Sequence, residues 1–164
     1  MNGMDANRKN RILDLAGICA RWLLGILFVY TGAQKIWDPV TFLKLVRQYD
    51  LVQTPFLLNS IAATLPWFEA FCGALLILGV AVRGTALTVF CVLVPFTAVV
   101  WHRALVLQAA KLIPFCAVKF DCGCGTGEVF ICTKLLENCL LILLSCWVIS
   151  GWGRGCALRY SLTE

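Results

Sequence analysis

The chain has 164 residues, of which 60% are apolar and 14% charged, and its mean hydropathy is +0.84. A soluble domain of this length usually carries about 25% charged residues, so the composition excludes an ordinary water-soluble protein and predicts one embedded in a lipid bilayer. The net charge of +5 is spread along the connecting segments and both ends of the chain, which argues against a nucleic-acid partner.

The first predicted spanning helix follows a polar segment. Residues 1–14 include a basic cluster at positions 8–11, and we expect a short, loose tail there. The apolar stretch from Leu15 to Trp37, with Arg21 near its start, is long enough to cross about 30 Å of hydrocarbon. A signal peptide is the alternative, because Thr31-Gly32-Ala33 offers the small residues that a peptidase requires. We expect a spanning helix rather than a cleaved leader.

A change of composition between Asp38 and Pro55 predicts a helix of a different kind. Phe42, Leu45, Val46 and Tyr49 recur there at helical spacing, with polar and charged residues between them. Such a helix is amphipathic, and we expect it to lie along the membrane surface.

Three more apolar runs predict three more spanning helices. Pro66 and Pro95 lie inside two of them, and membrane helices tolerate proline where neighbours satisfy the freed carbonyl groups. We expect a tight turn at Arg83-Gly84 and a polar, glycine-containing loop at Gln108–Glu128. The three runs are Phe56–Val82, Thr85 to about Leu107, and Val129–Trp152.

The predicted fold is an all-α membrane protein, a four-transmembrane-helix bundle with a short amphipathic surface helix between helices 1 and 2. The bundle covers residues 15–152, and the tails 1–14 and 153–164 lie together on one side of the bilayer. Lysines and arginines divide evenly, seven on each side, so their number does not set the orientation. The compact basic cluster borders the first helix, and we therefore expect cytoplasmic termini and a periplasmic cysteine loop.

Four of the ten cysteines fall between Cys116 and Cys132. Cys122 and Cys124 are one glycine apart, so their α-carbons can reach the disulfide range of about 4.4 to 6.8 Å, with strain. A strained disulfide is oxidising and labile, which suits exchange with a partner better than a structural role. We predict thiol exchange at this loop.

The outer cysteines of the loop leave alternatives open. Cys116 and Cys132 form either a second redox pair in a relay or a static brace, or Cys132 belongs to a stripe with Cys139 and Cys146 at seven-residue spacing. A site with four thiolate ligands is a weaker alternative, because zinc sites use cysteine pairs two to four residues apart, and we expect no metal. We interpret the cysteines inside hydrophobic runs as core residues, namely Cys19, Cys72, Cys91, Cys139 and Cys146.

Glu69 lies near the middle of the second run, where an ionised carboxylate costs several kcal/mol unless it is paired or protonated. Its role is either interhelical pairing or proton exchange with a quinone held beside it. Glu137 and Asn138 in the fourth apolar run lie nearer the membrane boundary than Glu69, and we expect them to form interhelical hydrogen bonds. The candidate partners of Glu69, all in or bordering spans, are Arg21, Gln34, Lys35 and His102.

These residues resemble the DoxX-like superfamily, and specifically its MauE branch. The resemblance extends from Arg21 to about Trp152 and is carried by Arg21–Gly25, Thr31–Lys35, Pro66–Glu69 with Gly73, and the Cys-Gly-Cys-Gly loop. It implies a four-span protein of the bacterial inner membrane that, with a thioredoxin-like periplasmic partner, helps to form the disulfides of methylamine dehydrogenase. Gly125 stands where the branch commonly has an aromatic residue, so the identity of the client enzyme is left open.

The resemblance and the residues together predict a membrane thiol–disulfide oxidoreductase that passes electrons to a quinone, as in the quinone-linked disulfide generators, whose C-x-x-C pair this chain lacks. Cys122 and Cys124 would exchange with the thioredoxin-like protein. The alternatives are a non-enzymatic scaffold or chaperone for a periplasmic enzyme, and a subunit of quinone-linked thiosulfate oxidation. The predicted catalytic residues are Cys122, Cys124, Cys116 and Cys132. The predicted quinone-binding residues are Glu69, Gln34, Lys35, Arg21 and His102.

Overall fold

The computed structural model describes residues 2–50, 54–123 and 127–151, and of residues 2–10 only the backbone. Four of its helices are long and apolar enough to cross a membrane. These are α1 (Asn2–Trp37), α3 (Pro55–Leu78), α4 (Val82–Lys111) and α5 (Ile131–Ile149). The short helix α2 (Pro39–Gln48) follows α1, and a 3₁₀ turn, η1 (Phe115–Ala117), leads into the hairpin of β1 (Lys119–Asp121) and β2 (Glu128–Phe130). The predicted all-α, four-span fold is confirmed.

Glycines bring the backbones of α1 and α3 into direct contact. A Cβ atom added to Gly73 would lie 2.6 Å from the carbonyl oxygen of Gly25 and 2.7 Å from the amide nitrogen of Val29. One added to Gly32 would lie 2.7 Å from the carbonyl oxygen of Pro66. The two helices run antiparallel, since the later position on α1 meets the earlier one on α3. Small residues allow this approach, which is a common way of joining helices in membranes.

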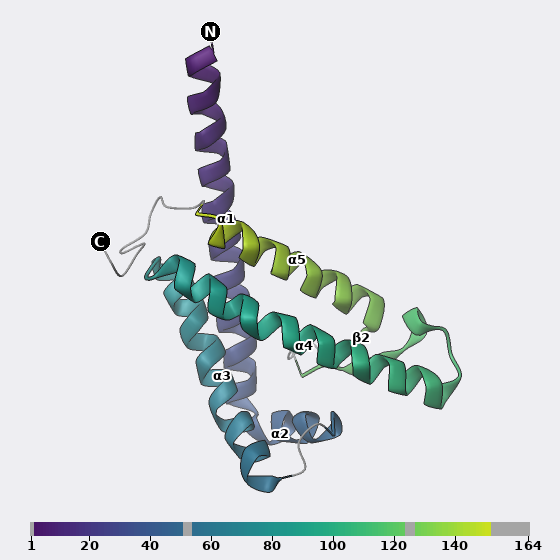
Figure 1. The fold of residues 1–164 in the computed structure, drawn as a ribbon. Helices are drawn as coiled ribbons and strands as arrows, with labels where there is room; N and C mark the ends of the chain where they lie inside the picture. The colour runs from purple at the N-terminus through teal and green to yellow at the C-terminus, as the bar shows by residue number, and fades with distance from the viewer. Residues whose placement is uncertain (1, 51–53, 124–126, 152–164) are drawn as a thin grey trace.

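The other two spanning helices, α4 and α5, form a second pair. Asn138 of α5 donates a hydrogen bond to Thr97 of α4 (3.2 Å), so the interhelical bond expected for Asn138 is confirmed. The two pairs share one core near the α3–α4 turn, where Leu24, Leu76 and Val89 are fully buried. Away from that turn the pairs diverge, and α2 and the hairpin lie in the opening between them (Figure 1).

The amphipathic helix α2 covers this opening. Asp38 caps its first turn by accepting a hydrogen bond from the Thr41 amide (3.0 Å), which holds the pKa of Asp38 below its ordinary value. Its apolar residues face a cavity inside the protein, and its position along the membrane surface stays a prediction. The protein itself therefore supplies an apolar partner for this face. The residues that line the cavity from this segment are Phe42, Leu45, Val46 and Tyr49.

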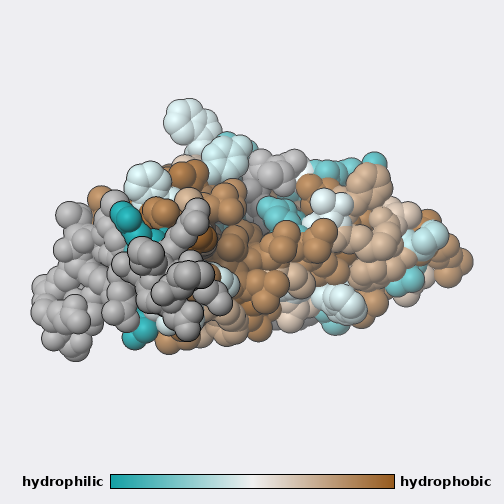
Figure 2. All heavy atoms as spheres, turned by 90° about the horizontal axis from the view of Figure 1, so that it is seen from above, coloured by the Kyte–Doolittle hydropathy of each residue, from teal (hydrophilic) through white to brown (hydrophobic). Residues whose placement is uncertain are grey.

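The outer surface of the bundle is apolar, as a lipid-facing surface should be. Figure 2 shows apolar side chains over most of the face in view, apart from the part covered by grey residues. Each spanning helix contributes to this surface, for example Leu23, Phe71, Leu87 and Leu143, all of which are exposed. Since lipid tails are as apolar as leucine, burial inside the bundle is not required of such side chains.

Four expectations about local structure are wrong. The tight turn expected at Arg83-Gly84 lies at residues 79–81 instead, because Gly79 adopts the left-handed conformation that ends α3, and Arg83 and Gly84 both lie in α4. The expected loose tail is helical from Asn2, because residues 4–14 contain neither glycine nor proline and extend α1. The expected loop at 108–128 contains the end of α4, η1 and β1, and Val129 lies in β2 rather than in a helix. Of the five cysteines interpreted as core residues only Cys72 is buried. Cys91 lines the internal cavity, and lipid accepts the small apolar side chains of the other three. The exposed ones are Cys19, Cys91, Cys139 and Cys146. The predicted tail at 153–164 lies outside the described residues.

Candidate functional site

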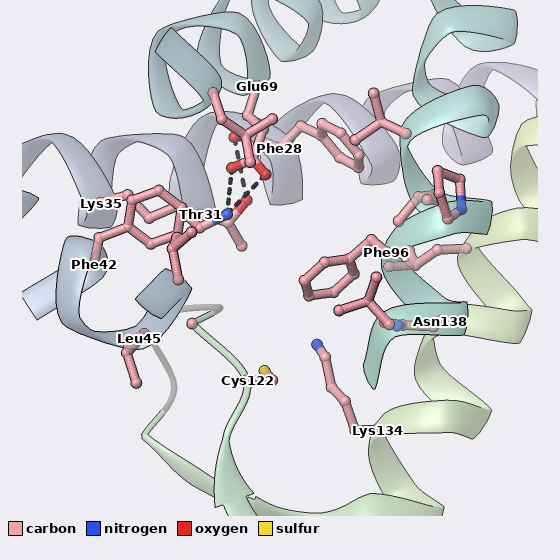
Figure 3. Close-up of a pocket in the computed structure, with 18 of the residues that line it drawn as sticks. Phe28, Thr31, Lys35, Phe42, Leu45, Glu69, Phe96, Cys122, Lys134 and Asn138 are labelled. Atoms are coloured by element: carbon pink, nitrogen blue, oxygen red, sulfur yellow. Dashed lines mark hydrogen bonds and ion pairs between the residues drawn. The ribbon is translucent and has the colours of Figure 1, made fainter. Parts of the chain in front are cut away.

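A cavity of about 510 Å³ lies between the two helix pairs. All five α-helices and the cysteine loop contribute to its lining, which is mostly apolar (Figure 3). Four charged side chains interrupt the apolar lining of the described residues: Lys35, Glu69, Lys134 and Glu137. A mostly apolar cavity of this size with a few polar groups is typical of a small-molecule site.

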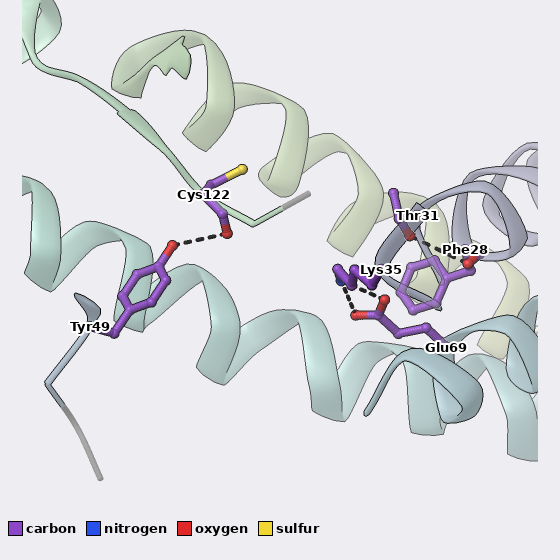
Figure 4. A network of polar contacts seen from close by, with 6 residues as sticks. All are labelled: Phe28, Thr31, Lys35, Tyr49, Glu69 and Cys122. Atoms are coloured by element: carbon purple, nitrogen blue, oxygen red, sulfur yellow. Dashed lines mark hydrogen bonds and ion pairs between the residues drawn. The ribbon is translucent and has the colours of Figure 1, made fainter. Parts of the chain in front are cut away.

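Lys35 and Glu69 form an ion pair on one wall of the cavity. The Lys35 ammonium donates to both carboxylate oxygens of Glu69, at 2.7 and 2.5 Å, and the two residues are only 7% and 8% exposed (Figure 4). The ring of Phe42 on α2 covers the ammonium, with its centroid 5.2 Å away. A carboxylate inside a membrane bundle requires such a partner. Of the four candidates expected for Glu69, the structure selects Lys35.

The other three predicted quinone-binding residues lie outside the cavity lining. Gln34 and His102 are exposed. Arg21 is fully buried, one helical turn before Gly25 and so nearer the α3–α4 turn than the cavity. Of the five predicted quinone-binding residues, only Lys35 and Glu69 therefore come together at the cavity.

The opposite wall is a polar face of α5 that begins with Lys134. This ammonium is 5% exposed and donates to Glu137 at 3.0 Å, so this hydrogen bond of Glu137 lies within its own helix, whereas a bond between helices was expected. Lys134, Glu137, Asn138 and Leu141 all line the cavity, at positions i, i+3, i+4 and i+7 of one helix face. The sequence interpretation missed Lys134, and this spacing was the signal that would have found it.

Cys122 reaches the cavity from the cysteine loop and is only 2% exposed. Its carbonyl oxygen accepts a hydrogen bond from the Tyr49 hydroxyl (3.0 Å; Figure 4). A Cβ atom added to its neighbour Gly123 would be in van der Waals contact with Phe42 and Leu45 of α2. The loop and the amphipathic helix thus share one face of the molecule, as the order of the spans predicts. Cys124 lies outside the described residues, and so does the predicted pairing of the two cysteines.

Cys116 and Cys132 form a disulfide that joins η1 to the first turn of α5, with their α-carbons 5.1 Å apart. The predicted second pair is present, so Cys132 does not belong to a stripe of core cysteines. Because the disulfide uses both sulfurs, they are not available as the thiolate ligands of the alternative metal site. Cys116 is exposed, whereas Cys132 packs against the hydrophobic cluster that contains Cys122. The two cysteine sites are therefore neighbours with opposite accessibility.

This arrangement of spans, surface helix and cysteine loop lies within a region that matches a known family, described as methylamine utilisation protein MauE, over residues 13–151. The chain belongs to the MauE family. Membership links this MauE-family protein to methylamine utilisation, and its four apolar helices make it a multi-pass membrane protein. The wider DoxX-like superfamily stays a prediction. Comparisons with curated proteins and with solved structures found no match.

Proposed function

We propose that this MauE-family protein is a membrane thiol–disulfide oxidoreductase that supports disulfide formation in a periplasmic client. In methylamine utilisation this client would be methylamine dehydrogenase. One observation carries the proposal: Cys122 is buried on the wall of an apolar cavity and lies in the same hydrophobic cluster as one end of a formed disulfide. A cysteine thiol, a disulfide and a candidate small-molecule site are therefore close to one another.

Accessibility suggests the order in which the cysteines act. Cys116 is exposed and Cys122 is almost fully buried, so a protein partner reaches the Cys116–Cys132 disulfide first. This order is the reverse of the one expected from the sequence. A thiolate of the thioredoxin-like partner attacks this disulfide, and resolution of the mixed disulfide leaves the partner oxidised and the pair reduced. The same exchange then passes two electrons and two protons to the pair of Cys122 with Cys124.

The cavity fits a quinone as the final electron acceptor. Its volume lies within the usual range of about 300 to 1,000 Å³ for small-molecule sites, and its walls are apolar. Lys35 and Asn138 would donate hydrogen bonds to the carbonyl oxygens, and Phe96 would pack against the ring. When bound, the quinone would accept the two electrons and two protons that the thiols release. Glu69 holds the Lys35 ammonium in place by accepting two hydrogen bonds from it.

The Cys116–Cys132 disulfide also supports the proposed orientation in the bacterial inner membrane. Disulfides persist in the periplasm and are rare in the cytosol. A disulfide at the end of α5 next to the cysteine loop therefore favours a periplasmic loop, with the two termini in the cytoplasm.

A trapping experiment tests the proposal. The purified protein is mixed with a thioredoxin-like partner that lacks its resolving cysteine, and mixed disulfides are identified by mass spectrometry. The unaltered protein and the control Cys139→Ser, which removes an exposed cysteine of α5, should form the adduct. The double variant Cys116→Ser/Cys132→Ser should not form it. Cys122→Ser should form the adduct but lose turnover with a soluble quinone. Absence of any adduct, with normal client maturation in all variants, would reject the proposal.

The scaffold alternative has one observation in its favour. The Cys116–Cys132 disulfide ties η1 to α5, as a static brace would. A scaffold needs no chemistry at Cys122, so Cys122→Ser would then support client maturation as well as the unaltered protein does.

A further inference from the structure

The buried lysine of α5 requires an explanation. An ammonium in the interior of a membrane bundle loses its hydration, which is energetically unfavourable. Lys134 is 5% exposed, whereas the side chain of Glu137, to which it donates a hydrogen bond, is 49% exposed. Such an expensive cation in a cavity is a candidate for a role in chemistry.

Lys134 lies on the same side of the cavity as Cys122. Both line it, and Figure 3 shows the ammonium extending from α5 into the cavity near the sulfur, with the Lys35–Glu69 pair at the far side. Ile131 and Leu135, which flank Lys134 on α5, belong to the hydrophobic cluster that contains Cys122. This cluster is apolar, and the low local dielectric that it provides strengthens the effect of a cation on a nearby thiol.

We propose that Lys134 is a positioning residue that holds Cys122 as a thiolate whenever its sulfur is reduced. The thiol proton leaves to water, the ammonium keeps its three protons, and no electrons move in this step. A thiolate is the form that attacks a disulfide or departs from one. The inference deepens the proposed function, but its test needs neither a partner protein nor a quinone.

The other groups around Cys122 do not replace this cation. The Tyr49 hydroxyl of α2 donates to the Cys122 carbonyl, and Asp121 of β1 accepts from the Gly123 amide. Across the cavity, the charges of Lys35 on α1 and Glu69 on α3 cancel each other. The described lining residues of α4 include the Cys91 thiol but no charged side chain. Asp121 and Glu137 disfavour a thiolate by their charge, so among the described lining residues on this side Lys134 is the one that favours a thiolate.

The test is the pH profile of Cys122 alkylation in the reduced, full-length protein. Iodoacetamide is applied over a range of pH, and the adduct on the Cys122 peptide is quantified by mass spectrometry. The midpoint should lie below the usual thiol value of about 8.5. Lys134→Met should raise it by about one unit, which lowers the rate at pH 7 about tenfold. Lys134→Arg, which keeps the charge, should retain the low midpoint.

Two further variants make the result decisive. Lys119→Met removes an exposed lysine of β1 and should leave the midpoint unchanged. Glu137→Gln removes a competing carboxylate on a half-exposed side chain and should lower the midpoint. This variant provides the test if Lys134→Met does not fold. Identical profiles for the unaltered protein and every folded Lys134 and Glu137 variant would overturn the inference. Failure of the trapping experiment would not affect it, so the two outcomes remain distinguishable.

Discussion

Replacing Gly73 by alanine should force α1 and α3 apart. The new Cβ atom would lie 2.6 Å from the Gly25 carbonyl oxygen and 2.7 Å from the Val29 nitrogen, whereas ordinary contacts begin at 3.4 Å. Both neighbours are backbone atoms, so no flexible side chain can move out of the way. The helices must separate by the difference, about 0.8 Å at this point, and overpacking of this kind typically costs about 1 to 3 kcal/mol. The loss should appear as a lower free energy of unfolding.

The assay is unfolding in mixed micelles by titration with a denaturing detergent, followed by circular dichroism. Gly84→Ala is the matched control, because a Cβ atom at Gly84 in α4 meets nothing within 4 Å. Alanine also has the higher helix propensity, so this control should gain roughly 0.5 to 1 kcal/mol. If Gly73→Ala proved as stable as Gly84→Ala, the backbone contact between α1 and α3 would be disproved.

Three further changes should have measurable effects. Lys35→Met leaves the Glu69 carboxylate buried without its cation and should cost about 3 to 5 kcal/mol in the same unfolding assay, whereas Lys35→Met/Glu69→Leu should recover most of this loss. Serine at both ends of the Cys116–Cys132 disulfide, whose sequence separation is 16, should cost about 3 kcal/mol and make thermal unfolding insensitive to reductant. Tyr49→Phe removes the hydrogen bond to the Cys122 carbonyl and should speed the reaction of the reduced Cys122 thiol with maleimide, whereas an unchanged rate would show that α2 does not hold the loop in place.

The architecture was predictable because the bilayer imposes strict demands on a sequence. Each span needs about twenty apolar residues, and runs such as Leu15–Trp37 reveal this directly. The spacing of Phe42, Leu45 and Val46 also revealed α2, but amphipathicity does not say whether the apolar face meets lipid or protein. For the same reason Cys139 and Cys146 were wrongly predicted to be core residues, since an apolar residue of a membrane helix can face either the bundle interior or lipid.

The site was predictable only in part, because it depends on how the helices are aligned. Glu69 had four candidate partners, and the choice of Lys35 follows from the register that the glycine contacts impose on α1 and α3. The burial of Cys122 depends on the packing of its loop against α2, which involves residues more than seventy positions apart in the sequence. Lys134 was overlooked because a single lysine near the start of an apolar run is commonly an interfacial residue.

The four charges of the cavity determine how ligand binding responds to the membrane potential. Lys35 and Lys134 are balanced by Glu69 and Glu137, so the described lining carries a formal charge of zero when the thiols are neutral. An uncharged molecule that enters or leaves moves no net charge across the transmembrane field, which acts at about 2.3 kcal/mol per elementary charge per 100 mV. Occupancy of the cavity by a neutral ligand should therefore be independent of membrane voltage, whereas formation of a thiolate at Cys122 should not.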